Sequence, residues 1–344
     1  SFSLSLSATM PPRMLEHGVG MKLTAFLACF LVYAVFLVAV LGSLLVPIYA
    51  VFVPQAGMPV YVVTALIAVY VVNVAVTRKE LRCHDKWHAF AQKAPWLVLM
   101  RRYVQFEIAD LPLKLREAEK KEGAQFVFAI GPHGADSMFR VLLEGELDKA
   151  FPNMHSKIFS LAASVLFMLP LVRELTLWTG CVDARRAVAD KVLRKGNSIL
   201  VIPGGEAEQL MTIQGTEALY IKHRKGFVRL AMTHAVPVVP AYCFGVNDTF
   251  YCSRFLYGPR HALMKTLGVC IPFAYGLWGS SMCPQPSKHT VVFGEPLTFP
   301  CKVPGEPTPE EVVAAHAQYM VEVEKLFDKH KGAMGMPERK LLLC

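Results

Sequence analysis

A long apolar run near the start of this chain constrains its fold more than any other feature. From Leu23 to Thr77 the sequence contains no Asp, Glu, Lys or Arg. One helical crossing of a bilayer needs about 20 apolar residues, so a run of roughly fifty-five is long enough for two crossings. A run of this kind is exceptional in the core of a soluble protein. The sequence therefore predicts a transmembrane segment over residues 23–77.

Prolines divide this run into two helices. Pro47 and the stretch 54–59, which begins and ends with proline, break the apolar pattern. They predict one helix near residues 23–46 and a second near residues 60–76, joined by a short uncharged connector. The prediction is a helical hairpin preceded by an N-terminal tail over residues 1–22.

Basic residues flank the predicted hairpin on both sides, at Arg13, Lys22, Arg78, Lys79 and Arg82. Because Lys and Arg collect on the cytoplasmic side of membrane helices, both ends of the hairpin are expected to face the cytosol. The net charge of +9 is compatible with nucleic acid, but the bases lie beside the apolar run. A membrane lipid surface is therefore the expected partner, and nucleic acid is not.

The nine cysteines are scattered, with no C-x-x-C pair and no Cys/His spacing of a zinc site. They predict reduced thiols in a cytosol-facing protein and no metal.

Residues 78–122 are charged and interleave aromatic with basic side chains. Two interpretations stay open: helices lying at the membrane interface, or an ordinary amphipathic pair packed on the following domain. The remaining residues, 123–344, alternate strand-like and helix-like segments and predict a catalytic α/β domain. Within it, the nearly apolar segment 156–169 is too short to span a bilayer and is expected to form a buried helix or the wall of a lipid channel.

The strand expected over residues 126–130 ends abruptly at Gly-Pro-His-Gly, which places His133 at a strand tip. An imidazole there is suited to accept a proton from a substrate, and Asp136 lies three residues further on. Residues 136–149 have helical periodicity, so Gly134 is expected near a helix N-terminus, where free N–H groups favour negative charge.

A second strand, over residues 198–202, ends in the same way. It runs into Pro-Gly-Gly at 203–205, followed by Glu206 and Glu208. Because the carboxyl ends of parallel strands meet at one edge of a sheet, the two tips are expected to share a site. A third strand is expected over residues 236–245.

Several of these segments together resemble the type-2 diacylglycerol acyltransferases, which include monoacylglycerol acyltransferases and wax synthases. The matching segments run in order along the chain: Gly-Pro-His-Gly at 131–134, Pro-Leu-Val-Arg-Glu at 170–174, Pro-Gly-Gly-Glu-Ala-Glu at 203–208, Arg-Lys-Gly-Phe-Val-Arg-Leu-Ala at 224–231 and Val-Pro-Ala-Tyr-Cys-Phe-Gly at 239–245. The resemblance implies a glycerolipid-acyltransferase-like mixed sheet flanked by helices, with the N-terminal hairpin as membrane anchor.

The family's motif reads His-Pro-His-Gly, so its first histidine is replaced by Gly131 here. Only His133 can then carry the catalytic role. The resemblance favours Glu208 as the acid paired with His133, with Asp136 as the second candidate, because pairing across the two tips would orient the ring as a triad acid does.

The implied reaction is direct acyl transfer from acyl-CoA, a co-substrate, to diacylglycerol, with no cofactor. His133 acts as general base, and backbone N–H groups at Gly134, Gly204 or Gly205 stabilise the oxyanion. Arg224 and Lys225 are candidates for binding the phosphates of coenzyme A. No Gly-x-Ser-x-Gly elbow for a serine acyl-enzyme is present in these 344 residues.

Alternatives remain at this level. The acceptor is open between diacylglycerol, monoacylglycerol and a fatty alcohol, and a lipid hydrolase or a non-catalytic membrane scaffold would share some features. The expected location is the endoplasmic reticulum membrane with a cytosolic catalytic domain, and the lipid droplet is a second location. Oligomeric state is open.

Overall fold

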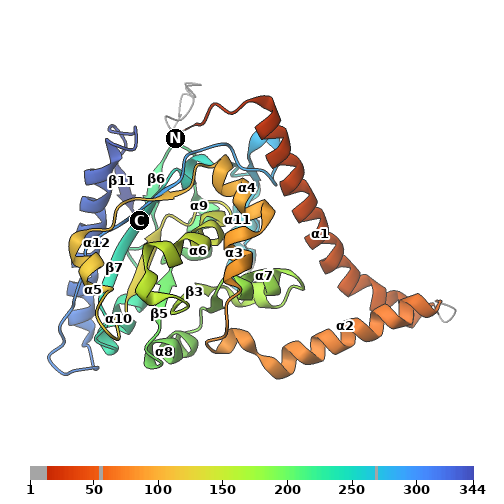
Figure 1. Cartoon of the computed structure of the whole chain (residues 1–344), viewed down its shortest axis with the longest axis horizontal. Helices are drawn as coiled ribbons and strands as arrows, with labels where there is room; N and C mark the ends of the chain where they lie inside the picture. Colours follow the sequence, from red (N-terminus) through yellow and green to blue (C-terminus); the bar gives the residue numbers. More distant parts are fainter. Residues whose placement is uncertain (1–13, 54–56, 268–269) are drawn as a thin grey trace.

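The computed structural model describes residues 14–53, 57–267 and 270–344. Its central layer is a seven-stranded sheet in the order β1-β10-β7-β2-β5-β3-β4 (Figure 1). The strands are β1 (Glu107–Ile108), β2 (Val127–Gly131), β3 (Ile158–Ala162), β4 (Cys181–Asp183), β5 (Ser198–Val201), β7 (Val238–Phe244) and β10 (Thr290–Phe293).

Strands β2, β3, β4, β5 and β7 run parallel, whereas β10 is antiparallel to β7 and β1 is parallel to β10. The predicted mixed α/β class is thereby confirmed. Two small sheets lie outside this layer. One pairs β6 (Glu217–Leu219) with β11 (Leu341–Leu343), and the other pairs β8 (Tyr251–Cys252) with β9 (Ala274–Tyr275).

Helices cover both faces of the sheet (Figure 1). They are α3 (His88–Lys93), α4 (Pro95–Tyr103), α5 (Leu113–Ala118), α6 (Met138–Ala150), α7 (Val172–Trp178), α8 (Arg186–Arg194), α9 (Gly205–Met211), α10 (Gly226–Thr233), α11 (Tyr257–Leu267) and α12 (Pro309–Lys331). Successive side chains of β2 enter different core clusters, because a strand alternates its faces. Val127 and Ala129 pack with α8, α10 and α12, whereas Phe128 and Ile130 pack with α6.

Two apolar helices, α1 (Val19–Phe52) and α2 (Met58–Thr77), extend from the sheet domain and converge away from it (Figure 1). Both are long and apolar enough to cross a membrane, and all but two of their residues are exposed or partly exposed. Ala25 and Cys29 of α1 are buried against α4. The exposed apolar surface of a helical pair this long points to membrane association.

Some boundaries differ from the prediction. Helix α1 continues through Pro47 instead of ending at residue 46. A proline costs a helix one hydrogen bond, and apolar membrane helices tolerate that loss. Residues 1–13, most of the expected tail, and residues 54–56 of the expected connector lie outside the described residues.

The segment 156–169 is not an α-helix, so the first of its two predicted forms, a buried helix, was wrong, and the second, the wall of a lipid channel, stays a prediction. It forms β3 and a short 3-10 helix over Ser164–Phe167. Ile158 and Phe159 are buried because β3 lies between β5 and β4 inside the sheet, where both faces of a strand are covered. Leu166 and Met168, beyond the strand, are exposed. Residues 78–122 contain α3, α4 and α5 as expected, but they also supply β1, which pairs with β10.

Candidate active site

His133 lies just beyond the carboxyl end of β2 with a partly buried ring. Its Nδ1 is 3.1 Å from the carbonyl oxygen of Gly134. A carbonyl only accepts, so Nδ1 carries the proton and Nε2 keeps its lone pair. Burial lowers the pKa of His133 below its ordinary value of 6.5. The imidazole is therefore neutral near neutral pH and able to accept a proton at Nε2.

Gly134 makes this geometry possible. Its φ is +68°, and a Cβ at this position would collide with the side chain of Val246. Only glycine adopts that conformation and fits that space at low cost. Its N–H has no hydrogen-bond partner within the described part of the chain, so it is free to donate to a bound group.

Glu208 reaches the same turn from helix α9. Its Oε1 accepts from the backbone N–H of His133, and its Oε2 accepts from the backbone N–H of Tyr220 at 3.0 Å. The side chain approaches so closely because residue 204 is glycine, where a Cβ would collide with the carboxyl group. Glu208 is 2% exposed, and this burial raises its pKa to about 7.

The structure thus brings Glu208 to His133 as the sequence predicted, but the contact is with the backbone. No hydrogen bond joins the Glu208 carboxyl to the imidazole among the residues described. We expected the Glu208 carboxyl to orient the His133 ring as a triad acid does, and among the described residues no such contact is present. In this arrangement Glu208 fixes the loop that carries His133, and Gly134 orients the ring.

Asp136 lies on the same turn as His133. Its Oδ1 accepts from the backbone N–H of Met138 at 3.0 Å, at the start of α6. Its Oδ2 is buried without a hydrogen-bond partner in the described ranges. Burial raises the pKa of Asp136 to about 6. The carboxyl group of Asp136 is thus desolvated on the turn that carries the histidine, with one oxygen unsatisfied.

Two residues that the sequence did not single out complete the site. Gln209 donates from Nε2 to the carbonyl oxygen of Ala135 at 2.5 Å, so α9 holds the turn at a second point. Tyr220 supplies the other N–H that binds Glu208. Both act through backbone contacts between distant segments, which leave no motif in a sequence.

The glycines of the second strand tip have different roles. Gly205 has a φ of +54° and donates its N–H to the carbonyl oxygen of Ile202 at 3.2 Å, so that N–H is engaged in a turn. Gly204 provides the space for Glu208. Among the described residues, neither the N–H of Gly134 nor that of Gly204 has an acceptor, and of these two Gly134 directly follows His133 in the chain.

Arg224 and Lys225 precede α10. Arg224 is exposed and Lys225 is partly buried, and neither forms an ion pair with any described residue. The charge of Arg224 acts to lower the pKa of Glu208, which places it near the site. Arg224, near Glu208, and its chain neighbour Lys225 are suited to bind an anionic group.

The C-terminal strand β11 holds β6, the strand that precedes Tyr220, in place. β11 pairs in parallel with β6, and the backbone N–H of Cys344 donates to the carbonyl oxygen of Leu219 at 2.7 Å. The side chain of Leu219 fills the space beside Gly131, where a Cβ would collide with it. The position of the family's first motif histidine is therefore occupied by packing from β6.

A buried ionic cluster ties this C-terminal segment to the domain. Arg339 lies 2.6 Å from the Glu217 carboxylate and 2.9 Å from that of Asp248. Both acids are buried, and Glu217 also accepts from the Tyr242 hydroxyl at 2.6 Å. Arg339 thus pairs with two buried carboxylates. One of them, Glu217, is the first residue of β6, the strand that ends just before Tyr220.

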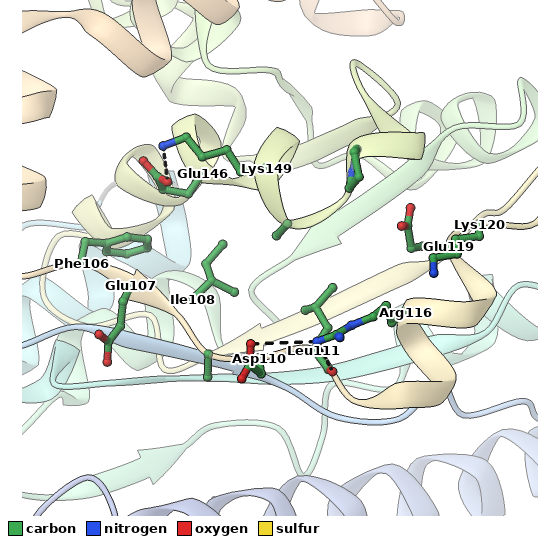
Figure 2. Close-up of a pocket in the computed structure, with 13 residues that line it drawn as sticks. Phe106, Glu107, Ile108, Asp110, Leu111, Arg116, Glu119, Lys120, Glu146 and Lys149 are labelled. Atoms are coloured by element: carbon green, nitrogen blue, oxygen red, sulfur yellow. Dashed lines mark hydrogen bonds and ion pairs between the residues drawn. The ribbon is translucent and has the colours of Figure 1, made fainter.

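A hollow of about 630 Å³ lies elsewhere, along β1, α5 and α6 (Figure 2). It has pairs of opposite charge, Arg116 with Asp110 and Lys149 with Glu146, at 4.0 and 2.7 Å. None of the residues that line it belongs to the His133 site. The site is therefore identified by its chemistry and not by the size of this hollow.

Comparisons with known proteins identify the family of this chain. The family model described as diacylglycerol acyltransferase matches residues 60–344. Diacylglycerol O-acyltransferase 2 of Mus musculus is 34% identical over 234 residues, which cover 63% of this chain and 59% of that protein. The Homo sapiens protein of the same name is 33% identical over 234 residues with the same shares. 2-Acylglycerol O-acyltransferase 1 of Mus musculus is 31% identical over 241 residues, covering 64% of this chain and 70% of that protein.

The chain thus spans 59% of the length of the first two of these relatives. Among solved structures, the 1-acyl-sn-glycerophosphate acyltransferase PlsC from Thermotoga maritima matches with a TM-score of 0.39 and 15% identity, covering 83% of this chain and 98% of that one. The fold class rests on the sheet described above. Since the family match covers most of its length, this chain belongs to the diacylglycerol acyltransferase family.

Proposed function

We propose that this protein is a membrane-bound acyl-CoA:diacylglycerol O-acyltransferase that makes triacylglycerol by direct acyl transfer. The observation that carries the proposal is the state of His133. Its Nδ1 donates to Gly134, which leaves Nε2 as a base at the edge of the sheet. The family match and the relatives named diacylglycerol O-acyltransferase 2 support the reaction class.

In the proposed reaction, His133 Nε2 removes the proton from the free hydroxyl of diacylglycerol. The hydroxyl oxygen then attacks the thioester carbonyl carbon of acyl-CoA, and a C–O bond forms as the carbonyl becomes an oxyanion. Collapse of this intermediate breaks the C–S bond. Coenzyme A leaves as the thiolate and takes the proton back from His133.

The N–H of Gly134 is suited to stabilise the oxyanion, because no described residue accepts a hydrogen bond from it. Glu208 holds the loop through the His133 N–H, so the donor and the base keep one geometry. Arg224 and Lys225 are proposed to bind the phosphates of coenzyme A. The Asp136 carboxyl group, on the same turn as His133, is proposed as the second candidate acid of the site.

The helices α1 and α2 are proposed to span the endoplasmic reticulum membrane, with the sheet domain in the cytosol and the lipid droplet as a second location. An apolar hollow of about 420 Å³ lies between both helices and the start of α7. At its edge the Tyr70 hydroxyl donates to Glu174 at 2.8 Å, which joins α2 to the domain. Apolar space at this junction suits the acyl chains of membrane substrates.

Monoacylglycerol is the second candidate acceptor. The relatives that favour it are named 2-acylglycerol O-acyltransferases and are 31–32% identical to this chain. A fatty alcohol is a further acceptor known in the resembled family.

The test is acyl transfer from labelled oleoyl-CoA to diacylglycerol, monoacylglycerol and a long-chain alcohol, using the full chain in membranes. We expect triacylglycerol as the main product and its loss in His133→Ala. His234→Ala is the matched control, because His234 is hydrogen-bonded to Asp190 away from the site. Full activity in His133→Ala would refute the site. Fatty acid release without transfer would indicate a hydrolase, and the absence of any reaction would favour a scaffold.

A further inference from the structure

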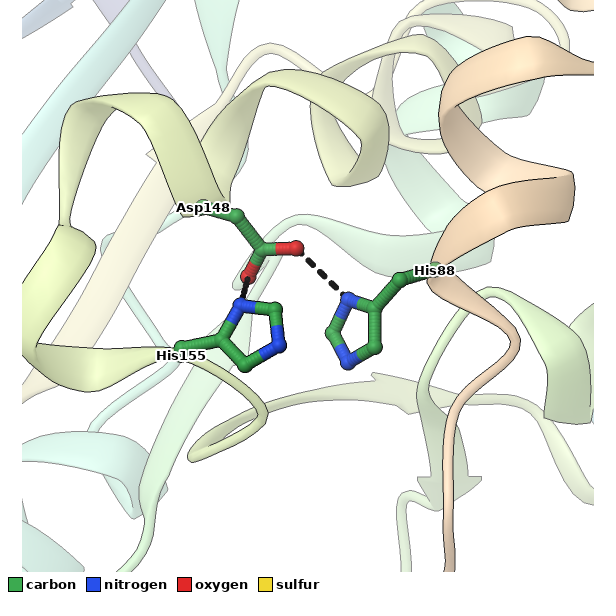
Figure 3. Close-up of side chains that lie close together, drawn as sticks. All are labelled: His88, Asp148 and His155. Carbon is green, nitrogen blue, oxygen red and sulfur yellow. Dashed lines mark hydrogen bonds and ion pairs between the residues drawn. The ribbon is translucent and has the colours of Figure 1, made fainter.

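Two histidines and an aspartate outside the proposed active site converge on one point at the surface. They are His88 at the start of α3, Asp148 near the end of α6 and His155 in the loop before β3. In Figure 3 both imidazole rings turn toward the Asp148 carboxylate. Three donor atoms from three separate elements lie within 4.8 Å of one another. The proposed acyl transfer does not use any of them.

The donor atoms of this group lie close enough together to share one small cation after a small adjustment. His88 Nδ1 lies 2.6 Å from Asp148 Oδ2, and His155 Nδ1 lies 3.2 Å from Asp148 Oδ1. Zinc binds nitrogen and oxygen at about 2.0–2.2 Å, so donors on one ion are separated by about 3–4 Å. The 2.6 Å contact is shorter than that separation, so His88 and the Asp148 carboxylate must move slightly apart to hold an ion. The His155 side chain is 57% exposed and free to turn toward it.

The surroundings of His88 resemble the outer support of a metal ligand. Its second nitrogen, Nε2, lies 2.5 Å from the Ser156 hydroxyl. When a metal occupies Nδ1, the proton resides on Nε2 and is donated to that hydroxyl, which fixes the ring. Gln92 donates to Asp148 Oδ2 at 3.4 Å and steadies the carboxylate.

We propose that His88, Asp148 and His155 form a zinc site, with water completing the tetrahedral coordination. Two imidazoles and one carboxylate favour zinc over magnesium, which prefers oxygen ligands alone. The ion would link α3, which follows the membrane helices, to α6, which begins directly after the turn that carries His133. Its role is to hold these segments together, and it does not enter the acyl transfer.

The same contacts also exist without an ion. Both rings can donate from Nδ1 to the Asp148 carboxylate, and the stacked rings, with centroids 4.2 Å apart, then form a hydrogen-bonded cluster. The two arrangements differ in what they predict. A hydrogen-bonded cluster takes up no zinc at these residues, whereas a zinc site takes up one ion and depends on all three ligands.

The experiment uses the full chain in detergent, treated with EDTA and dialysed, then titrated with Zn²⁺ by calorimetry. We expect one zinc ion to bind per chain at these three residues. Its affinity should fall at least about 100-fold in Asp148→Asn and in His155→Gln, and about 10-fold in Ser156→Ala. His155→Gln alters an exposed side chain, so it tests the ligand if Asp148→Asn does not fold. His234→Asn is the matched control, since His234 pairs with Asp190 through one histidine only, at 2.9 Å.

Zinc binding is expected to raise the Tm of the parent protein by a few degrees and of the Asp148→Asn variant by much less. Co²⁺ gives a second readout that does not depend on activity: a visible d–d spectrum without thiolate charge transfer, which separates this site from the nine free cysteines. Absence of zinc binding, unchanged binding in both ligand variants, a thiolate spectrum or equal competition by Mg²⁺ would each overturn the proposal.

Discussion

Glu208 accepts a hydrogen bond from the backbone N–H of His133, and its other oxygen accepts from the backbone of Tyr220. A triad acid would instead accept from the imidazole and hold its tautomer. In this protein the Gly134 carbonyl holds the tautomer. The Glu208 carboxyl group therefore acts as a clamp: it joins two loops through their backbone N–H groups and does not set the tautomer of the imidazole.

Replacing Glu208 by Gln keeps one oxygen acceptor and loses one of the two backbone hydrogen bonds. We expect kcat to fall about 10-fold, in line with about 1–3 kcal/mol for an unsatisfied buried N–H. A triad acid would cost about 10⁴-fold in the same substitution. Steady-state kinetics with oleoyl-CoA distinguishes the two, and a loss near 10⁴ would contradict the clamp.

The pKa of Glu208 also makes stability depend on pH. Burial raises it from 4.5 in the unfolded chain to about 7 when folded. A carboxyl group whose pKa is raised by folding binds its proton more tightly in the folded state. Its contribution to the free energy of unfolding is therefore complete below about pH 4.5 and is lost as the pH rises through about 7. The loss is on the order of 3 kcal/mol, since each pKa unit corresponds to about 1.4 kcal/mol.

Glu208→Gln cannot ionise, so its stability should fall less than that of the parent protein between pH 5 and 8. Urea unfolding at a series of pH values measures the difference. Asp136, whose pKa is raised in the same direction, is present in both proteins, so their difference isolates Glu208. Parallel pH curves for the two proteins would be inconsistent with a protonated Glu208.

The decrease of kcat/KM at acidic pH should depend on the protonation of His133. Because burial lowers its pKa below 6.5, the base form persists into mildly acidic solution. We expect kcat/KM for acyl transfer to fall only below about pH 6.5. The measurement compares pH profiles of the parent protein and of His234→Ala, which should coincide. A decrease centred well above 6.5 would argue against His133 as the base.

Arg339 should be required for the C-terminal strand to stay in place. Arg339→Ala leaves the buried carboxylates of Glu217 and Asp248 without their cation, which costs about 3–5 kcal/mol in buried pairs. Thermal unfolding measures the loss, and activity should fall with it because β6 leads to Tyr220. Lys340→Ala, at the neighbouring exposed position, is the control and should change neither.

The packing of Leu219 beside Gly131, the position at which this chain departs from the family motif, can be tested by substitution. Gly131→Ala places a Cβ against the side chain of Leu219, so overpacking is expected to destabilise the domain by about 1–3 kcal/mol. The double variant with Leu219→Ala removes the collision and should recover part of that loss in a double-mutant cycle. Simple additivity of the two changes would show that the packing contact is unimportant.

Local patterns were enough to predict much of this protein. The uncharged run predicted two apolar helices, because length and composition alone decide whether a segment can cross a bilayer. Apolar runs that end in Gly-Pro or Pro-Gly-Gly predicted β2 and β5, and the parallel order of strands predicted that their ends meet. His133 and Gly134 were found in this way because they follow a strand directly, whereas the choice of Glu208 as the paired acid came from the family resemblance.

Other features depended on contacts between residues far apart in the chain. The segment 156–169 is apolar, and a buried strand inside a sheet has the same composition as a buried helix, so only its neighbours β4 and β5 decided between them. The same holds for β11, whose partner β6 lies more than a hundred residues away. The backbone contact of Glu208, which sets its role, was also invisible in the sequence.

The sequence by itself thus determined the class of the protein: an α/β domain with two apolar helices, a histidine at a strand tip and the motifs of one family. These follow from local periodicity and composition, which each segment carries alone. Only the tertiary structure decided that Glu208 binds the backbone of His133, that Leu219 fills the space beside Gly131, and that His88, Asp148 and His155 meet. Such contacts depend on packing between distant segments, which no local pattern encodes.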